Sequence, residues 1–289
     1  MIYNLGSINA DLFYQLPHLP GPGETLASTG FHRGLGGKGA NMSVAAARAA
    51  AHVAHIGAVG EDGKWAVARL MEYGVDTRHI ASSEAATGHA VIYVDGAGEN
   101  QIVLFGGANL GLGQGHVTAA LGDAGPTDTL MFQNETNLQS YAAGLARQKG
   151  MRVVYAAAPF DAAAVAEVLE RIDLLVLNEV EAAQLTQAMG CAITALDVAD
   201  IVITLGGDGC RHISSGAGID RHFPGIKVEV VDTTGAGDTF TGYLVAGLDA
   251  GMSMEASIER AQRAGALMVT RQGTADVIPD LKDLAGFQR

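Results

Sequence analysis

The segment from Val230 to Phe240, with the sequence VVDTTGAGDTF, contains the residues whose types and spacing are best suited to chemistry. We predict an apolar strand that ends at Asp232, a turn of small residues, and a long apolar helix whose first turn contains Asp238. Capping of that helix would explain the presence of Asp238, but it would not explain the presence of Asp232 and Thr234. A functional loop is therefore the better interpretation of this segment.

The small residues of this loop suit an anion. The backbone N–H groups of Gly235, Ala236 and Gly237 can point into one concavity and form an anion hole. The carboxylate of Asp238, beside that hole, can accept a proton from an attacking hydroxyl. Asp238 is therefore the candidate catalytic base.

A second glycine-rich loop, residues 34–39 (GLGGKG), matches the GxGxxG fingerprint of dinucleotide-binding proteins. That fingerprint requires a buried strand before it and an acidic residue about 20 positions after it. Residues 28–33 are polar instead, and residues 53–60 contain no acidic residue. A dinucleotide-binding oxidoreductase therefore stays only as a distant alternative, and the sequence contains no P-loop motif.

The same loop leads into a predicted helix with Asn41 in its first turn. Free N–H groups at the start of this helix and the positive charge of Lys38 would suit an anionic ligand. Taken alone, the loop is more typical of a capped helix with a surface lysine. Both interpretations stay open at this point.

Asn178 and Glu181 lie three positions apart at the start of another predicted helix. Their oxygens could hold Mg²⁺ through water molecules, and they could also form a capping box, and the two roles are compatible. His52 and His55 also lie three positions apart, but at the start of a predicted strand, where this spacing directs side chains to opposite faces. We therefore do not expect a metal site at the histidines.

Predicted strands and helices alternate along most of the chain, which is typical of an α/β fold with a mostly parallel sheet covered by helices on both faces. The first strand would deliver Asn9 and Asp11 at its carboxyl end, where ligands bind in such sheets. We expect strands at residues 2–8, 53–59, 128–133, 151–157, 173–177 and 200–205, and helices at residues 41–51, 63–74, 137–149, 162–170, 179–188, 237–250 and 254–271.

Residues 12–32 and 88–105 interrupt this alternation. Both segments are extended and rich in Tyr, Thr, Val and Ile, and the second turns back at residues 95–98. We expect them to form a small β-sheet lid on a single domain of residues 1–289. One small layer cannot cover all the apolar side chains of the lid, which predicts a homodimer with two lids face to face; these side chains are Phe13, Val91, Tyr93, Ile102 and Leu104.

Composition narrows the possible partners. Among the 289 residues, 18 Lys and Arg against 31 Asp and Glu give a formal net charge of −13, without a basic run. Nucleic acids and anionic membranes are therefore disfavoured partners. The two distant cysteines suit a reducing compartment, and the sequence contains neither a basic leader nor an apolar run of roughly 18 residues. We expect a cytoplasmic protein.

Four motifs, in this order, resemble the PfkB family of carbohydrate kinases: Asn9-Ala10-Asp11, Gly36-Gly37-Lys38-Gly39-Ala40-Asn41, Asn178-Glu179-Val180-Glu181 and Asp232-Thr233-Thr234-Gly235-Ala236-Gly237-Asp238. Five shorter segments resemble the members of that family that act on free pentoses: residues 6–11, 22–25, 96–100, 107–109 and 269–271. The resemblance covers nearly the whole chain. It implies the fold of that family and the activity of an ATP-dependent sugar kinase.

The resemblance also implies roles at the matching positions. The sugar would be bound by Asn9, Asp11, Gly37, Lys38, Asn41, Glu135 and Asp238, with Asp238 as the catalytic base. The nucleotide would be bound by Asn178, Thr204, Gly206, Gly209 and Gly237. Glu181 would hold Mg²⁺ through water, and a monovalent cation, K⁺, would bind Asp232, Thr234 and backbone oxygens of residues 269–273.

Two features depart from the pattern of the pentose kinases. Val277 occupies a position where they offer a serine to the cation, so one side-chain ligand is missing. The stretch between Glu181 and Thr204 is also short, which predicts a different edge around the adenine.

The charges around the predicted sugar site indicate a neutral substrate. Residues 7–30 and 88–109 contain no Lys or Arg that could hold a second phosphate. The amides and acids of the site suit several neutral hydroxyls. We therefore expect phosphorylation of the terminal hydroxyl of a pentose, with D-ribose first. Another polyol or a nucleoside, whose base could stack on Phe13, Tyr14 or Phe105, is the alternative within the family.

Overall fold

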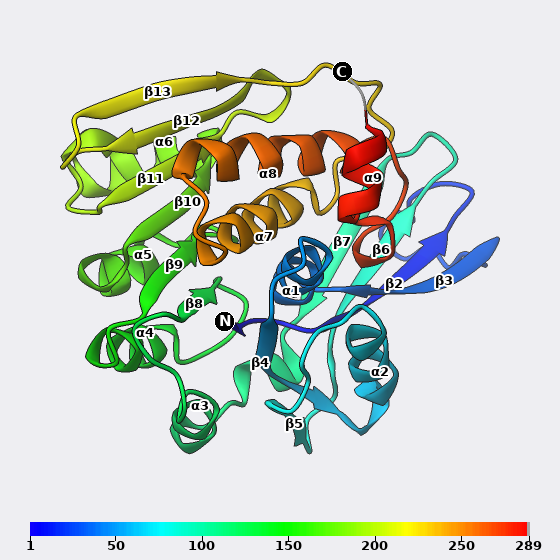
Figure 1. The fold of residues 1–289 in the computed structure, drawn as a ribbon. Helices are drawn as coiled ribbons and strands as arrows, with labels where there is room; N and C mark the ends of the chain where they lie inside the picture. The colour runs from blue at the N-terminus through cyan, green and yellow to red at the C-terminus, as the bar shows by residue number, and fades with distance from the viewer. Residues whose placement is uncertain (288–289) are drawn as a thin grey trace.

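A large sheet crosses the molecule in the computed structural model, which describes residues 1–287 (Figure 1). Its strands are β1 (Ile2–Leu5), β4 (Val53–Gly60), β5 (Ile80–Ser83), β8 (Thr129–Phe132), β9 (Arg152–Ala156), β10 (Leu174–Asn178), β11 (Asp200–Thr204), β12 (Gly209–Ser214) and β13 (Ile219–Pro224). They lie in the order β13-β12-β11-β10-β9-β8-β1-β4-β5. Pairing is parallel from β5 to β11 and antiparallel at β12 and β13, so the carboxyl ends of the central strands meet at one edge.

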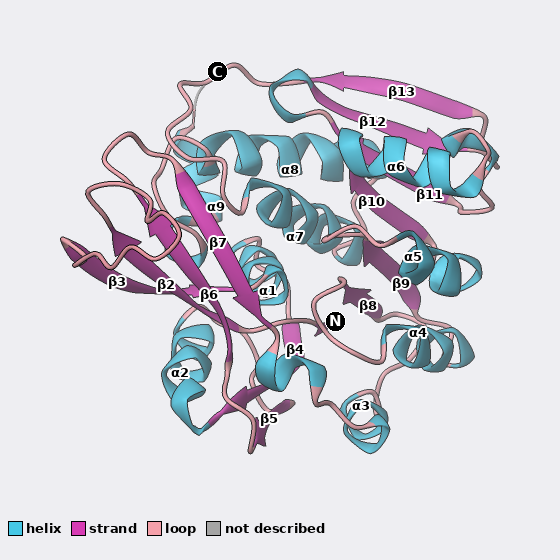
Figure 2. Ribbon diagram, turned by 180° about the vertical axis from the view of Figure 1, so that it is seen from behind, coloured by secondary structure: helices cyan, strands magenta, loops and turns pink. Residues whose placement is uncertain are grey.

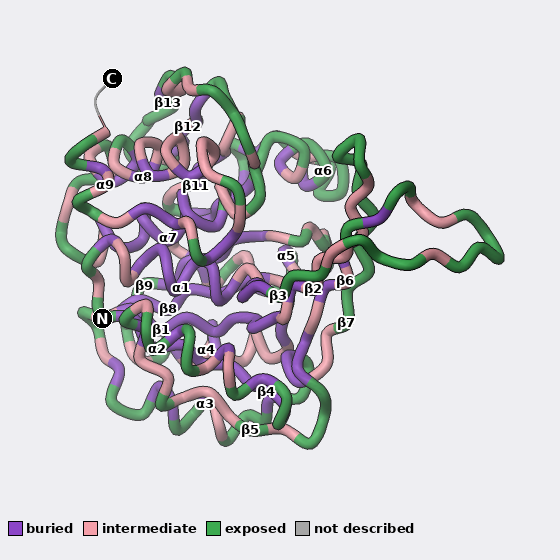
Figure 3. The backbone as a smooth tube through the Cα atoms, turned by 90° about the vertical axis from the view of Figure 1, so that its right-hand side faces the viewer, coloured by how far each residue is buried: buried purple, intermediate pink, exposed green. Residues whose placement is uncertain are grey.

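Helices cover both faces of this sheet. One face carries α1 (Lys38–Arg48), α2 (Lys64–Glu72), α7 (Ala236–Asp249), α8 (Met254–Met268) and α9 (Leu281–Gly286), and the other carries α3 (Gln114–Ala120), α4 (Gln139–Gln148), α5 (Ala162–Val168) and α6 (Glu179–Met189). Strand side chains alternate between the faces, so Ile2 joins the core under α1 and α7 whereas Tyr3 joins the core under α3 to α6. The buried backbone is concentrated in the middle of the molecule (Figure 3). The predicted fold class is confirmed.

A second, smaller sheet stands beside the large one (Figure 2). It contains β3 (Gly30–Gly36), β2 (Asn9–Gln15), β6 (Gly88–Val94) and β7 (Asn100–Phe105), in that order. β2 pairs with β6 in parallel, and the two outer pairs are antiparallel. The sheet uses parts of the segments 12–32 and 88–105, but it begins earlier, at Asn9, and residues 16–29 form no strand.

Helices α1 and α7 lie against one another at a glycine. A Cβ atom at Gly242 would come within 2.5 Å of the Cβ of Ala45 and 2.6 Å of the carbonyl oxygen of Met42, so no larger residue fits. The alanine-rich α1 adds little side-chain bulk on its own side. As a result, the first turns of both helices lie side by side, and each helix follows one of the two glycine-rich loops.

The structure corrects several details of the predicted elements. The strand expected to end at Asp232 is wrong: residues 225–231 form no strand, and Val231 is instead held by its N–H donating to the carbonyl of Val269. The first predicted strand, 2–8, ends at Leu5, and Asn9 begins a strand of the small sheet. Sequence patterns missed β5, α3, β12, β13 and six short 3₁₀ helices, at residues 61–63, 107–110, 169–171, 193–195, 206–208 and 275–277.

Among the described residues, none of the helices has the length and apolar character needed to span a bilayer.

Candidate active site

Asp238 lies where the two glycine-rich loops meet. It occupies the first turn of α7 and is only 6% exposed. The side-chain amide of Asn41, on α1, donates to its Oδ2 at 2.8 Å, and the Lys38 ammonium lies 3.8 Å from its Oδ1. The charge of Asp238 is the main cause that raises the pKa of Lys38, so the lysine is a stable cation beside the carboxylate. The contact between the helices therefore places a base and a cation side by side.

The loop before α7 offers fewer free amides than its sequence predicted. The N–H of Ala236 donates to the carbonyl of Thr233 at 3.2 Å. Within residues 1–287, the N–H groups of Gly235 and Gly237 have no protein acceptor. The three-amide anion hole expected from Gly235, Ala236 and Gly237 is thus reduced to two available donors, at the positive end of a helix of 14 residues.

Glu135 joins the two segments that bear the predicted sugar-binding residues. Its Oε2 accepts the N–H of Lys38 at 2.9 Å and the hydroxyl of Ser7. The same hydroxyl accepts the N–H of Gly39 at 3.2 Å. Gly37 caps α1, and its carbonyl accepts the N–H of Asn41. The polar groups on this side are therefore oriented by bonds to other protein groups.

Asn9 and Asp11 project from β2 toward this region, and both are buried. Asn109 donates to Asn9 Oδ1 at 2.8 Å and accepts the N–H of Ile8 at 2.9 Å, which fixes the orientation of the Asn9 amide. The carboxyl of Asp11 packs directly over Gly36, where a Cβ atom would lie 2.0 Å from Oδ2. A larger residue at position 36 would displace the Asp11 carboxyl from this position.

Asp11 has a perturbed titration. Burial, followed by the nearby charges of Glu135 and Asp238, raises the pKa of its carboxyl to about 7. Within this group of acidic side chains, the ammonium of Lys38 lies within salt-bridge distance of the Asp238 carboxylate. A region with this charge distribution repels an anionic sugar phosphate and suits the hydroxyls of a neutral sugar.

The predicted nucleotide-binding residues lie on the other side of Asp238. A cavity of about 100 Å³ brings together Lys38, Asn178, Glu181, Thr204, Gly237 and Asp238. Asn178 and Glu181 form the predicted capping box at the start of α6, with bonds of 2.7 and 2.8 Å. Burial is the main cause that raises the pKa of Glu181. The capping box uses Oε2 of Glu181, so the other carboxylate oxygen, Oε1, is available to a ligand.

Gly206 and Gly209 do not line this cavity. Gly206 is exposed in the turn after β11. Gly209 is buried at the start of β12, where a Cβ atom would lie 2.0 Å from the carbonyl oxygen of Phe223. Close packing of the hairpin therefore requires a glycine at position 209, and the nucleotide-binding role of Gly206 and Gly209 stays a prediction.

The expected cation loop is held together by Asp232. Its Oδ1 accepts the N–H of Thr234 at 2.9 Å, and its Oδ2 accepts the N–H of Gly273 at 3.2 Å. The methyl groups of Val277 lie close to Gly273, so this side of the loop is apolar. Asp232 therefore joins the segment before α7 to the segment after α8.

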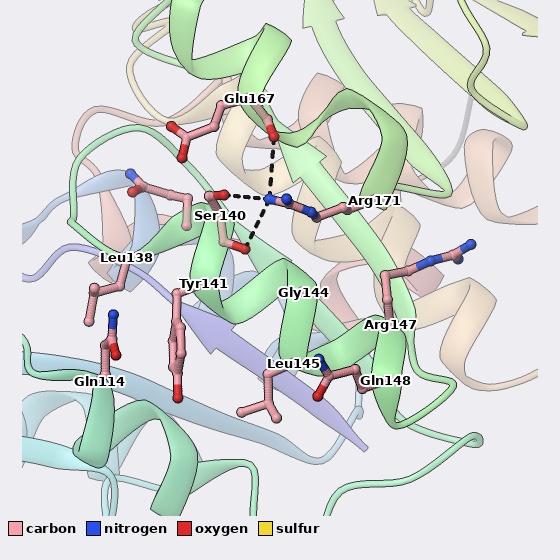
Figure 4. Close-up of a pocket in the computed structure, with 11 residues that line it drawn as sticks. Gln114, Leu138, Ser140, Tyr141, Gly144, Leu145, Arg147, Gln148, Glu167 and Arg171 are labelled. Atoms are coloured by element: carbon pink, nitrogen blue, oxygen red, sulfur yellow. Dashed lines mark hydrogen bonds between the residues drawn. The ribbon is translucent and has the colours of Figure 1, made fainter.

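A larger cavity, of about 810 Å³, lies apart from these residues (Figure 4). It is lined by residues of α3, α4 and α5, by Leu138 before α4 and by Arg171. The guanidinium of Arg171 donates to the hydroxyl and carbonyl of Ser140 and to the carbonyl of Glu167. None of the predicted site residues lines this cavity, so the smaller cavity beside Asp238 is the candidate active site.

Sequence reasoning assigned no role to Ser7 or Asn109, although both orient site residues. Ser7 contacts Glu135 and Gly39, and Asn109 contacts Asn9. Ser7 follows Gly6 in a conspicuous glycine turn, which was a usable signal. Asn109 is 100 residues from Asn9 in sequence, and no local pattern could pair them.

Comparisons with known proteins agree with the predicted resemblance. The profile described as pfkB family carbohydrate kinase matches residues 1–281. The ribokinase of Haemophilus influenzae is 38% identical over 298 aligned residues, which cover 98% of this chain and 96% of that protein. Ribokinase of Cryptococcus neoformans var. grubii, solved in complex with ADP, superposes with a TM-score of 0.83 at 33% identity, covering 99% of this chain and 98% of that one.

Ribokinase of Arabidopsis thaliana, solved with ribose and ATP, superposes with a TM-score of 0.87 at 28% identity and covers 99% of this chain and 97% of that one. The members that the five shorter segments resemble are thus ribokinases. The predicted resemblance, closest to ribokinase within its family, is confirmed.

Proposed function

Because this chain belongs to the PfkB family of carbohydrate kinases, we propose that it transfers the γ-phosphoryl group of ATP to the terminal hydroxyl of D-ribose and forms ribose 5-phosphate. The carrying observation is Asp238, bonded to Asn41 and beside Lys38, at a cavity that it shares with Asn178 and Glu181. One group of residues suits a sugar, the other suits a nucleotide, and a base lies between them.

In the proposed reaction, the Asp238 carboxylate accepts the proton of the attacking hydroxyl. The hydroxyl oxygen forms a bond to the γ-phosphorus while the bond between that phosphorus and the β–γ bridging oxygen breaks, and ADP leaves. Lys38 and the N–H groups of Gly235 and Gly237 stabilise negative charge on the transferred group. Positioning and charge neutralisation therefore supply most of the catalysis, without a covalent intermediate.

The donor set fits Mg²⁺ held mainly by the nucleotide. No cluster of three or more His, Cys, Asp or Glu in residues 1–287 could form a protein cage for a metal ion. Glu181 offers one carboxylate oxygen at the cavity, which is how Mg²⁺ is commonly bound beside substrate phosphates, through water. When bound, Mg²⁺ supplies positive charge to the phosphate oxygens.

For a monovalent cation, we propose that the oxygens of Asp232 and Thr234 and the carbonyls of residues 269–273 provide the site. The carboxylate of Asp232 supplies the negative charge, and the apolar Val277 lowers the number of side-chain ligands. A cation there would steady the loop that carries the two free amides. K⁺ is the ion we propose.

Register on the small sheet favours a sugar over a nucleoside. Ala10 pairs with His89, and His89 pairs with Phe105, so Phe105 lies on the face of Ala10 and not on that of Asn9 and Asp11. Tyr14 lies on that same far face by alternation along β2. Of the three aromatic residues considered for a nucleoside base, only Phe13 shares the face of Asp11.

We further propose that the small sheet closes over the sugar as a lid and joins two subunits in a cytoplasmic homodimer. All of β7 is exposed, and Ile102, Val103 and Leu104 are 54, 61 and 60% exposed. Apolar side chains in a row on an edge strand are typical of an interface. Sedimentation velocity at micromolar protein tests this, and a strict monomer would contradict it.

A comparison of kcat/KM among candidate substrates tests the proposed function. Steady-state kcat/KM with ATP and Mg²⁺ is measured for D-ribose, 2-deoxyribose, fructose 6-phosphate and adenosine. We expect D-ribose to have the highest value, because sites built to bind hydroxyls reject analogues that lack them. A higher kcat/KM for adenosine or fructose 6-phosphate would contradict the proposal. NADH fluorescence in the presence of the protein tests the dinucleotide alternative, for which we expect no change.

A further inference from the structure

Four polar side chains lie in the core directly beneath the proposed sugar site. Asn4 and His55 are paired neighbours on the central strands β1 and β4, and both are 0% exposed. Ser43, on α1, is also fully buried, and Gln133 follows β8. Buried strands at the centre of a parallel sheet are normally apolar, because an unpaired polar group there is costly. Packing alone therefore does not explain why these four positions are polar.

The four side chains form one connected chain of hydrogen bonds. Gln133 Nε2 donates to Asn4 Oδ1 at 2.9 Å, and Asn4 Nδ2 donates to Ser43 Oγ at 2.8 Å. Ser43 Oγ lies 2.8 Å from His55 Nδ1, and His55 Nε2 lies 3.0 Å from the carbonyl oxygen of Gly6. Asn4 Nδ2 also donates to the carbonyl oxygen of Gly39 at 2.7 Å.

The direction of each of these bonds is determined by chemistry. The Gly6 carbonyl can only accept, so His55 Nε2 carries a proton. Burial lowers the pKa of His55 to about 4, so the ring is neutral and its Nδ1 accepts. Ser43 therefore donates its proton to His55 and accepts from Asn4. Only one arrangement of the Asn4 amide satisfies the whole chain.

The chain is attached to the two backbone segments of the sugar site, through His55 at the carbonyl of Gly6 and through Asn4 at the carbonyl of Gly39. Gly6 precedes Ser7 and the strand that carries Asn9 and Asp11, whereas Gly39 belongs to the loop of Lys38. These segments touch one another, since a Cβ atom at Gly39 would lie 2.4 Å from Gly6 Cα. Above this contact, Ser7 and Lys38 N–H share Glu135.

From this connectivity we infer that His55, acting through Ser43 and Asn4, is a positioning residue for the sugar: it sets the spacing between the Gly6–Asp11 and Gly37–Asn41 segments. None of the four side chains lines the cavity of the nucleotide residues. His55 does not touch the proposed substrate. Its loss should therefore affect the binding of the sugar much more than the binding of ATP. The inference rests on the proposed function.

Two variants test the inference, with a buried histidine elsewhere as the matched control. Ser43→Ala breaks the chain with little change in volume, and His55→Phe removes both ring nitrogens. His212 is 3% exposed on β12 and bonds to Asp200 at 2.7 Å, away from both sugar segments. His212→Phe therefore removes a buried histidine bond without touching the chain. Thermal unfolding is measured for each variant, together with KM for ribose and for ATP.

We expect the ribose KM to rise about 10- to 100-fold in both Ser43→Ala and His55→Phe, because small displacements of binding groups have effects of that size. The ATP KM should stay within about twofold of the wild-type value, well below that range. His55→Gln, which can still donate to Gly6 and accept from Ser43, should recover part of the ribose affinity. His212→Phe should lower the unfolding temperature and leave the ribose KM unchanged.

Three results would overturn the inference. One is a wild-type ribose KM in a folded Ser43→Ala or His55→Phe variant, and another is an equal rise in both KM values. The third is a similar rise of the ribose KM in His212→Phe, which would indicate general destabilisation. Failure of the wild-type protein to phosphorylate ribose would instead overturn the proposed function, and the inference with it.

Discussion

The sugar side and the nucleotide side of the proposed site are organised in different ways. On the sugar side, Ser7, Asn9, Asn109 and Glu135 bond to one another or to backbone groups, and Asp11 packs over Gly36. On the nucleotide side, the side chains of Asn178 and Glu181 each accept one backbone N–H of the other residue, Glu181 Oε1 has no protein donor among the described residues, and Gly206 lies in an exposed turn. The sugar side is thus oriented before any ligand binds.

This difference indicates where selectivity resides. A preorganised group of acids and amides discriminates between substrates by the placement of their hydroxyls, since a missing hydroxyl leaves a buried polar group unpaired. A nucleotide bound through backbone N–H groups, one lysine and Mg²⁺ is recognised mainly by its phosphates. We therefore expect substitutions on the two sides to separate in their kinetic effects.

The largest effect is expected where the two sides meet. Asp238→Asn should fold normally, because the amide keeps the size of the side chain and can still accept the bond from Asn41. It removes the proposed base, so kcat should fall about 10²- to 10⁴-fold. The measurement is steady-state kcat with ribose and ATP, alongside circular dichroism of the variant. Retention of more than about a third of the wild-type kcat, far above that range, would rule out the assignment.

Paired carboxylate variants sharpen the comparison between the sides. Glu135→Gln should raise the ribose KM about tenfold and leave the ATP KM unchanged, because bonds to a charged group contribute about 1.5–3 kcal/mol. Glu181→Gln should do the reverse and also raise the Mg²⁺ concentration needed for half-maximal rate. Each variant serves as the control for the other. Equal changes of both KM values in either variant would break the distinction.

The pH dependence of sugar binding should report Asp11. Its pKa is raised to about 7 in the free protein, so below that pH the carboxyl is protonated and cannot accept two bonds from sugar hydroxyls. The ribose KM should therefore fall as the pH rises toward 7 and level off above it, while the ATP KM shows no such trend. Asp11→Asn should remove the dependence, and an unchanged pH profile in that variant would contradict the assignment.

The same shift has a consequence for stability. Between pH 3.8, the ordinary pKa of an aspartate, and about pH 7, the folded protein holds a proton on Asp11 that the unfolded chain has released. The contribution of this group to the free energy of unfolding therefore decreases as the pH rises through that window. Thermal unfolding across the window, compared between wild type and Asp11→Asn, measures this contribution. A smaller slope is expected in the variant.

The smallest effect is expected from the cation loop. Replacing Na⁺ by K⁺ at constant ionic strength should raise the rate of ribose phosphorylation, because a bound ion would steady the amides of Gly235 and Gly237. The missing ligand at Val277 limits this effect. Val277→Ser, which restores a side-chain oxygen near Gly273, should strengthen it. Equal rates in both salts for both proteins would remove the ion from the mechanism.

The sequence was informative where local chemistry and local structure coincide. The two glycine-rich loops, the capping box of Asn178 and Glu181, and the alternation of strands and helices all follow from residues close together in the chain. The strand assigned before Asp232 failed because an apolar run, including Val230 and Val231, forms an exposed extended segment instead. The antiparallel β12 and β13 were missed because the helix alternation stops there.

Sequence patterns could not predict which side chains from distant parts of the chain contact one another. Asn109 orients Asn9, Glu135 joins Ser7 to Lys38, and Asn4 meets His55 across two strands, each through contacts between distant parts of the chain. His55 lies in β4, whereas His52 precedes that strand and is exposed, and the bond of His55 to Ser43 depends on how closely α1 approaches the sheet. Such contacts follow from tertiary packing, which no local spacing encodes.

The position of the transferred phosphate tests the central claim most directly. Uniformly ¹³C-labelled D-ribose is incubated with the protein, ATP and Mg²⁺, and the product is examined by ¹³C and ³¹P NMR. The account predicts phosphorus coupling at the C5 carbon of the sugar, with one ADP formed for each ribose consumed. Coupling at C1, or ADP and inorganic phosphate without any phosphorylated sugar, would contradict it.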